Sequence, residues 1–372
     1  MKIFKYLNFI PYLFKLIFRF VREAYFNYSI QSHLFKSTRF SIGKDVVINN
    51  FQGFTPPKGG KIGNYSRILL VGFLNDQKRN QSIYLGNQVI ISQSVELTVW
   101  ENNHLIIQDN TSVQDNCKLL GSVTIERNCL LAPNIFMSSG NHYYNHNPYD
   151  LIKNQDKEIL STQEGVQAHV KPIHIEEDCW LGLGTFVKRG VYIGKGAIIG
   201  AYTSVLKDVP PYTVQLGSPN QTVKKRLDFI PPSMINATNE SHWPYFYRGF
   251  AQQASIRSKG LEQGGLFVHN KALITLEKKP FTTLKLTLFL NPGITSIEVT
   301  VSLNKVLISK LTLTPKQVQY NIDVTDEKYN QAINNLPLYP TILRSYHLFE
   351  FETSTDDAQD QLNYGVCCCE IV

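Results

Sequence analysis

The stretch that decides the fold is residues 175–209, which reads IEEDCW LGLGTF VKRGVY IGKGAI IGAYTS VLKDV when it is written in sixes. Each group begins with an apolar residue, and the same period runs from Ile107 to Met137. With 43% hydrophobic residues in the chain, a match at all leading positions of both runs has a chance of about 4 in 100,000 in one phase, so the period is real. The leading residues are Ile107, Val113, Leu119, Ile125, Leu131, Met137, Ile175, Leu181, Val187, Ile193, Ile199 and Val205.

A period of six is neither helical nor the simple alternation of an ordinary sheet. It fits a prism in which each strand of about six residues forms one side and three strands close one coil. Successive coils then stack about 4.8 Å apart, as hydrogen-bonded strands do. A second small or apolar residue stands four positions after each leading residue except Met137, and Cys117, Cys129 and Cys179 are among them. The pattern therefore predicts a parallel β-helix that buries these cysteines.

The glycines directly after leading residues, such as Gly182, Gly194 and Gly200, are expected to supply the turns between sides, together with nearby Asn and Asp residues. Near Asn102 and Asn103 the register slips by four residues. Before residue 85 the pattern is irregular. The β-helix is predicted to span residues 41–226.

Three segments make the pattern resemble a known family: Cys179–Gly182, Ile193–Ala201 and Lys207–Val214. They resemble the left-handed β-helix hexapeptide-repeat acetyltransferases, in particular the galactoside and maltose acetyltransferases and the bacterial polysaccharide O-acetyltransferases. The resemblance is strong from about residue 105 to 226 and weak from 40 to 104. It implies left-handed winding, a homotrimer, and acetyl-CoA as the acetyl donor.

A loop is inserted into the prism, because 38 residues separate Met137 from Ile175 and 38 is not a multiple of six. In the resembling family, a loop at this place carries the histidine that acts as general base, and His142 occupies that position within residues 138–174. Neutral imidazole can take the proton of a sugar hydroxyl as it attacks, which typically contributes ~100 to 10,000-fold in rate. His146 is the competing candidate for the base. Asn141, Tyr143 and His146 are predicted to contact the acceptor.

The donor site is expected on the outside of the last coils, as the resemblance implies. Small residues there permit close approach of the pantetheine arm, and lysines that follow are placed to meet the nucleotide phosphates. For Trp180, a role beside the thioester and a packing role at a coil corner are both open. A departure from the family is Asn220, because relatives usually carry Gly-x-Pro-Ala in this segment. The predicted contacts are Trp180, Gly182, Leu183, Gly200, Ala201, Lys207, Lys224 and Lys225.

The histidines and cysteines show neither zinc spacing nor a clustered carboxylate, so no metal site is predicted. Six cysteines in 372 residues are too few and too scattered for a disulfide scaffold, which favours a reduced, cytoplasmic setting.

The net charge of +7 is concentrated in residues 1–40, which hold seven Lys and Arg residues against one Glu. The rest of the chain is nearly neutral, which argues against nucleic-acid binding. Apolar residues recur at helical spacing in the same segment, and Pro11, Lys15 and Arg19 interrupt any signal peptide or membrane span. The segment is therefore predicted to be an amphipathic helix. It either lies on the inner face of the cytoplasmic membrane or covers the end of the adjacent domain.

From Gly265 the period becomes two, as Leu284, Leu286 and Leu288 show. Such alternation predicts antiparallel strands, and six or more strands within residues 265–372 suggest a β-sandwich. This domain is expected either to bind carbohydrate or to pack on and extend the trimer, since fold alone does not decide. Residues 227–264 contain three prolines and few regular patterns, and are predicted to be a linker or packing arm.

The combined prediction is an acetyl-CoA-dependent O-acetyltransferase that acts on a sugar hydroxyl of a bacterial capsule, lipopolysaccharide or related polysaccharide, or of its precursor. The first alternative is N-acetylation of an amino sugar, free or nucleotide-linked. The second is a noncatalytic carbohydrate-binding scaffold, against which His142 and the Lys207–Pro211 turn argue. Galactoside-type relatives carry acceptor-binding Asn and Asp residues before the loop, where this chain has Ser112, Lys118, Leu119 and Leu120, so a different acceptor is expected.

Overall fold

The computed structural model describes residues 40–50, 52–72, 80–162, 165, 168, 170–251, 254–315, 318–353 and 362–372. The chain divides into two compact units, with the boundary between Leu227 and Asp228. The predicted amphipathic segment lies outside the described residues except for Phe40, which is buried in the core of the first unit. Within the described part of the chain, no helix is long and apolar enough to cross a membrane.

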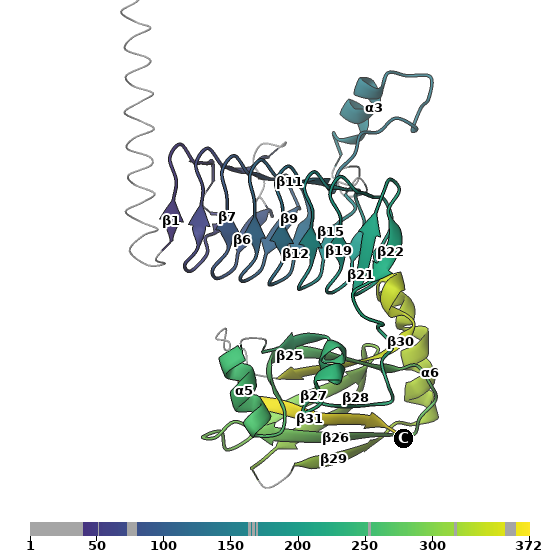
Figure 1. The fold of residues 1–372 in the computed structure, drawn as a ribbon. Helices are drawn as coiled ribbons and strands as arrows, with labels where there is room; N and C mark the ends of the chain where they lie inside the picture. Colours follow the sequence, from purple (N-terminus) through teal and green to yellow (C-terminus); the bar gives the residue numbers. More distant parts are fainter. Residues whose placement is uncertain are drawn as a thin grey trace, which may run out of the picture. The chain divides into compact units, whose positions relative to one another are not determined.

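The first unit is a three-sided parallel β-helix, as predicted (Figure 1). On each side, neighbouring strands as far as β20 are three elements apart in the chain, so three strands make one coil. The first side contains β1 (Ser41–Ile42), β4 (Lys61–Ile62), β7 (Ile90–Ile91), β10 (Ser112–Val113), β13 (Leu130–Leu131), β16 (Trp180–Leu181), β19 (Ile198–Ile199), β21 (Thr213–Leu216) and the antiparallel β22 (Gln221–Lys225).

The other two sides follow the same rule. The second side contains β2 (Val47–Ile48), β5 (Arg67–Leu70), β8 (Glu96–Val99), β11 (Lys118–Leu120), β14 (Phe136–Ser138), β17 (Phe186–Val187) and β20 (Ser204–Val205). The third contains β3 (Phe54–Thr55), β6 (Ser82–Leu85), β9 (His104–Ile107), β12 (Val123–Ile125), β15 (Ile173–Ile175) and β18 (Tyr192–Ile193). The irregular early segments therefore also form coils.

The leading residues of the six-residue period form the interior of the prism, and all of them are buried. They lie in register, so that Val113 pairs with Leu131 and Leu131 with Leu181. The three cysteines four positions after leading residues are buried as well. Burial raises the pKa of Cys117 to about 11, which keeps its thiol protonated at neutral pH.

The turns between sides differ from the expectation in one respect. The left-handed conformation falls three residues after the leading residue, at Asn110, Asn116 and Asn128 for example, and not at the glycine that directly follows it. Asn tolerates this conformation because its short side chain bonds locally. Gly182 serves close packing instead, because a Cβ atom there would lie 2.6 Å from the backbone nitrogen of Ala201 in the next coil.

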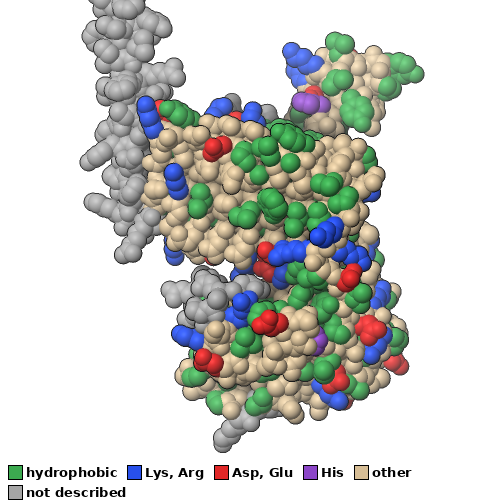
Figure 2. Space-filling model, viewed as in Figure 1, with side chains coloured by type: hydrophobic (Ala, Val, Ile, Leu, Met, Phe, Trp, Pro, Cys, Tyr) green, Lys and Arg blue, Asp and Glu red, His purple; other side chains and the backbone are tan. Residues whose placement is uncertain are grey.

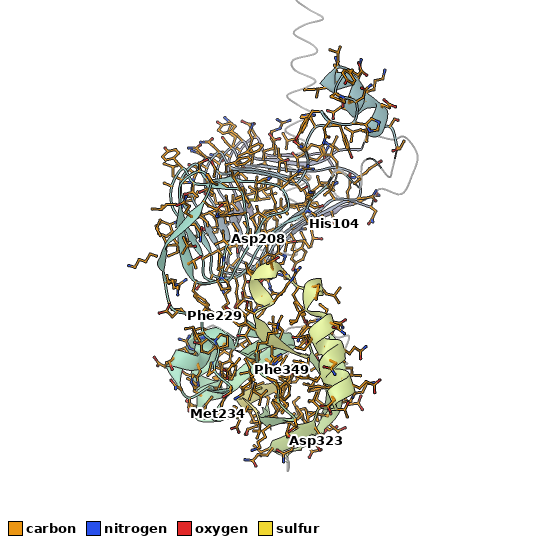
Figure 3. The ribbon with its side chains drawn as sticks, turned by 90° about the vertical axis from the view of Figure 1, so that its right-hand side faces the viewer. His104, Asp208, Phe229, Met234, Asp323 and Phe349 are labelled. Atoms are coloured by element: carbon orange, nitrogen blue, oxygen red, sulfur yellow. The ribbon has the colours of Figure 1, made fainter. Side chains whose placement is uncertain are left out.

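The second unit is an antiparallel sheet with helices, and its strands run in the order β28-β27-β30-β25-β31-β26-β29. Its core is separate from that of the prism and includes Phe349, which Figure 3 shows inside this unit. The strands are β23 (Met234–Asn236), β24 (Arg248–Phe250), β25 (Leu266–Glu277), β26 (Thr283–Leu290), β27 (Ile297–Leu303), β28 (Val306–Leu313), β29 (Gln319–Asp323), β30 (Tyr346–Thr353) and β31 (Tyr364–Ile371). The helices are α5 (Ala254–Glu262) and α6 (Asp326–Asn334), with short 3-10 helices η1 (Glu240–Tyr245), η2 (Leu336–Leu338) and η3 (Thr341–Leu343).

The strands of this unit belong to one hydrogen-bonded sheet and not to the two separate sheets of the suggested sandwich. The reason is β25, which pairs with β31 through Leu266–Val268 and with β30 through Lys271–Glu277. Part of the segment predicted to be a linker or packing arm also pairs with this sheet, since β23 pairs with β31 and β24 with β25.

Candidate active site

The inserted loop is closed at its base by backbone hydrogen bonds to the prism. Ser139 is buried, its backbone nitrogen donates to the oxygen of Leu120 (3.0 Å), and its oxygen accepts from the nitrogen of Lys171 (2.9 Å). The register of the third side is kept across the loop, because Ile125 pairs with Ile175. Figure 1 shows the loop, with helix α3 (Ile152–Ile159), standing out from the prism. An irregular segment can thus be added without disturbing the coils.

His142 lies in the first part of this loop, and its side chain is 80% exposed. Its Nδ1 atom is hydrogen-bonded to Oδ2 of Asp156, which belongs to α3. The ring nitrogen Nε2 is at the opposite edge of the imidazole. The predicted base is therefore both accessible and held in one orientation.

The three residues predicted to contact the acceptor occupy different environments. Asn141 and His146 are exposed, whereas Tyr143 is half-buried. The backbone nitrogen of Tyr143 donates to Oδ1 of Asp156 (2.6 Å), and its hydroxyl donates to the oxygen of Gly165 (2.8 Å). Tyr143 thus anchors the loop.

The outside of the loop carries large apolar side chains that the sequence reading did not single out. Figure 2 shows hydrophobic side chains on the surface of the segment that contains α3. Tyr144 is 59% exposed and Tyr149 is 97% exposed, and Leu151 and Ile152 are exposed as well. A surface of this kind is suited to contact another molecule.

Four of the predicted acetyl-CoA contacts meet at one corner of the last coils. The nitrogen of Gly182 donates to the oxygen of Ile199 (2.8 Å), and the oxygen of Leu183 accepts from the nitrogen of Tyr202 (2.7 Å). These bonds place Gly182 and Leu183 directly against Gly200 and Ala201. A Cβ atom at Gly200 would lie 2.0 Å from a methyl group of Leu216, so a larger residue would require the exposed side chain of Leu216 to move.

Trp180 lies on the outer face of the first side and is 51% exposed. Its neighbours across the sheet are Leu130 on β13 and Ile198 on β19. Leu130 is also more than half exposed. Trp180 therefore belongs to an apolar strip on the surface of the prism and is not buried at a coil corner.

Asn220, the departure from the family pattern, is completely buried and holds the turn that contains Lys207. Its Oδ1 accepts from the backbone nitrogens of Leu206 (2.9 Å) and Lys207 (3.3 Å), and its Nδ2 donates to Oε1 of Gln215 (3.2 Å). The side chain of Lys207 is exposed next to this turn. Asn220 thus makes side-chain hydrogen bonds that a glycine or alanine at this position could not make.

Lys224 and Lys225 lie on β22, opposite Val214 and Thr213 of β21. Both residues are exposed. Successive residues of a strand point to opposite faces, so these two side chains point away from each other. They are therefore not positioned to meet the same phosphate group, and their contacts with the nucleotide stay a prediction.

A buried ion pair lies in the last coils, between Nζ of Lys195 and Oε1 of Glu177 (2.6 Å). Burial acts to lower the pKa of Lys195, but Glu177 and other neighbouring groups outweigh this, and the net pKa is raised. Lys195 therefore stays charged and holds the coil in place, since a buried charge that lost its partner would be costly.

The residue that sequence reasoning missed is Asp156. It lies 14 residues after His142, in a segment that the six-residue period does not cover. A helical pattern at Ile152–Ile159 was the available signal, but pattern alone does not show that this helix folds back on His142.

Comparison with known proteins finds relatives among acetyltransferases. The chain is 26% identical over 200 residues to WcaF of Escherichia coli (strain K12), a protein assigned as a colanic acid biosynthesis acetyltransferase; the match covers 49% of this chain and 99% of WcaF. It is 34% identical over 112 residues to a Schizosaccharomyces pombe protein assigned as an acetyltransferase, covering 30% of this chain and 47% of that protein.

The chain is therefore similar in sequence to known acetyltransferases. The predicted resemblance is confirmed. The chain spans about half the length of the Schizosaccharomyces pombe relative. No family model matches the chain.

Two solved structures with coenzyme A bound are similar to part of this chain. One is galactoside acetyltransferase in complex with coenzyme A (20% identity, TM-score 0.22, 51% of this chain and 66% of that chain). The other is a mutant of perosamine N-acetyltransferase from Caulobacter crescentus with CoA and GDP-perosamine (17% identity, TM-score 0.29, 44% of this chain and 55% of that chain).

Proposed function

We propose that this protein transfers the acetyl group of acetyl-CoA to a hydroxyl group of a sugar, within a surface polysaccharide or its precursor. The observation that carries the proposal is the loop inserted into the prism, which presents His142 with 80% of its side chain exposed and one ring nitrogen held by a hydrogen bond. The relationship to WcaF supports the acceptor class, because that protein is assigned to the biosynthesis of a polysaccharide, colanic acid.

In the proposed reaction, Nε2 of His142 takes the proton of the hydroxyl group as its oxygen attacks the carbonyl carbon of the thioester. The carbon–oxygen bond forms, the carbon–sulfur bond breaks, and the sulfur of coenzyme A leaves with the proton that His142 returns. General-base assistance of this kind typically contributes ~100 to 10,000-fold. The histidine is suited to the step because imidazole gains and loses a proton near neutral pH.

The donor is proposed to lie along the corner formed by Gly182, Leu183, Gly200 and Ala201, beside Trp180 and Lys207. The absence of side chains at the glycines leaves backbone groups accessible to the pantetheine arm. Lys224 and Lys225 on β22 are proposed to meet different phosphate groups of coenzyme A, because successive side chains of a strand point to opposite faces.

The assembly is proposed to be a homotrimer of left-handed β-helices, as the family resemblance implies. Its support is the exposure of the two parts of the site: His142 on the loop and Trp180 on the prism are both largely open to water. A neighbouring subunit would exclude water from the thioester. The cytoplasmic location and the membrane contact of residues 1–40 remain predictions.

The runner-up is N-acetylation of an amino sugar, since a solved N-acetyltransferase also shares the fold. A panel of soluble glycans, amino sugars and nucleotide-linked sugars incubated with acetyl-CoA, read by mass spectrometry, separates the two. An acetyl ester on a neutral sugar is the expected product. Acetylation of amines alone would favour the runner-up, and no product with any acceptor would favour the noncatalytic scaffold.

His142→Ala is expected to reduce the rate of acetyl transfer by at least ~100-fold. Without the base, only the positioning of the two substrates would still accelerate the reaction. His146→Ala is the comparison variant, since this histidine is exposed in the same loop and is the competing candidate for the base. Initial rates and circular dichroism of both variants check the prediction. Full activity in His142→Ala together with loss of activity in His146→Ala would identify His146 as the general base.

A further inference from the structure

Asp156 uses both oxygens of its carboxylate to hold the residues at the start of the inserted loop. Oδ2 is hydrogen-bonded to Nδ1 of His142, and Oδ1 accepts from the backbone nitrogen of Tyr143 at 2.6 Å. The side chain of Asp156 is only 17% exposed, whereas that of His142 is 80% exposed. The carboxylate is therefore on the inner side of the contact and the imidazole on the outer side.

The position of Asp156 is set by the loop itself. The next residue towards the N-terminus, Gln155, is buried; its Oε1 accepts from the nitrogen of Asn147 (3.0 Å) and its Nε2 donates to the oxygen of Asp150 (3.0 Å). The hydroxyl of Tyr143 joins the start of the loop to Gly165. These bonds tie α3 to the segment before it, and the start of the loop to Gly165 after α3, so Asp156 is held before any ligand binds.

The chemistry of the contact selects one form of the imidazole. An ionised carboxylate can only accept hydrogen bonds, so Nδ1 of neutral His142 must carry the hydrogen. Nε2 is then left with a free lone pair, which is what a general base needs. Once His142 has taken a proton, the adjacent carboxylate also stabilises the imidazolium.

We propose that Asp156 is a positioning residue, which fixes the tautomer and the orientation of His142 and so makes Nε2 the base. This inference rests on the proposed function, because it assigns a role to the partner of the proposed base. It also gives α3 a role, because this helix lies outside the six-residue repeat and carries Asp156.

Asp156→Asn tests the role with almost no change in shape. The nitrogen of Tyr143 can only donate, so it selects the amide oxygen of the new side chain. The amide nitrogen then faces Nδ1 of His142 and can only donate to it, which forces the hydrogen of the imidazole onto Nε2. In that form Nε2 cannot accept a proton. We expect kcat to fall by ~100 to 10,000-fold, with KM for acetyl-CoA unchanged, because the proposed donor contacts lie on the prism.

Two further variants separate positioning from structure. Glu158→Gln removes the same charge from an exposed position of the same helix, two residues away, and should keep wild-type kcat. Asp156→Glu keeps the carboxylate on a longer side chain and should recover at least ~10-fold of the kcat lost in Asp156→Asn. Equal losses in Glu158→Gln and Asp156→Asn, or wild-type kcat in Asp156→Asn, would overturn the proposal.

A measurement that does not depend on activity is the tautomer of His142 in the full-length protein, read from the nitrogen-15 chemical shifts of its ring, with His142→Ala used to assign the signals. We expect the hydrogen on Nδ1 in the wild type and on Nε2 in Asp156→Asn. A wild-type hydrogen on Nε2 would refute the positioning role. If the wild type acetylates no sugar, the proposed function fails, while the tautomer still decides whether Asp156 orients His142.

Discussion

Neighbouring residues on a strand of the prism face in opposite directions, one into the core and one to the surface, and β13 shows this most clearly. Leu130 and Leu131 are consecutive and identical in type, yet Leu131 is buried in the core whereas Leu130 is 54% exposed. Since side chains alternate across a strand, one residue of each short strand must face inward. The six-residue period is the trace of this alternation, combined with the turn at each corner.

Leu131→Ala should therefore lower the free energy of unfolding by about 2–5 kcal/mol, because it leaves a cavity in a closely packed core. Leu130→Ala, the matched control, should change it by no more than about 0.5 kcal/mol, as exposed positions usually do. Chemical denaturation followed by circular dichroism measures both. A large loss in Leu130→Ala would mean that another molecule covers this surface in solution.

Among the elements, β30 carries an ionisable residue into the core of the second unit. His347 is completely buried, its Nε2 donates to the oxygen of Lys279 (2.8 Å), and the rings of Phe281 and Tyr329 pack edge-on against it. Burial lowers the pKa of His347; the hydrogen bond to Lys279 acts against this, and the charge of Lys278 acts with it. The folded protein therefore holds this histidine in its neutral form.

The stability of the second unit should depend on pH for this reason. In the unfolded chain a histidine binds a proton as the pH falls below about 6.5, but in the folded state His347 does not until a lower pH. The unfolded state then binds more protons, so stability is complete above about pH 6.5 and decreases as the pH falls from there towards the pKa of the folded state.

Thermal unfolding at about pH 7.5 and about pH 5.5 tests this expectation. The decrease in Tm between the two values should be smaller for His347→Gln than for the wild type, since glutamine does not titrate. The same decrease in both proteins would contradict a contribution from His347.

At the scale of the whole molecule, all residues proposed to act in acetyl transfer belong to the first unit. His142 and all proposed donor contacts lie before residue 227, and each unit has its own hydrophobic core. We therefore expect the second unit to serve acceptor binding or assembly.

A chain that ends at Leu227 should keep acetyl transfer to a short acceptor and remain a trimer in light scattering. If the second unit binds glycan, its loss should raise KM for a polymeric acceptor with little change in kcat, since binding energy shared by ground and transition states is removed. Loss of the trimer would instead assign the second unit to assembly. An active, stable monomer would contradict the proposal that a neighbouring subunit closes the active site.

The amino-acid sequence by itself determined the prism, the place of the inserted loop, its candidate histidine and the antiparallel strands after Gly265. It could do so because inward and outward positions are encoded locally, at every second or sixth residue. Only the tertiary structure decided the partner of His142, the opposite directions of Lys224 and Lys225, the role of Asn220 and the single continuous sheet formed through β25. These features depend on where an irregular loop folds back and on which strands pair although they are far apart in the sequence. A local sequence period contains no information about either.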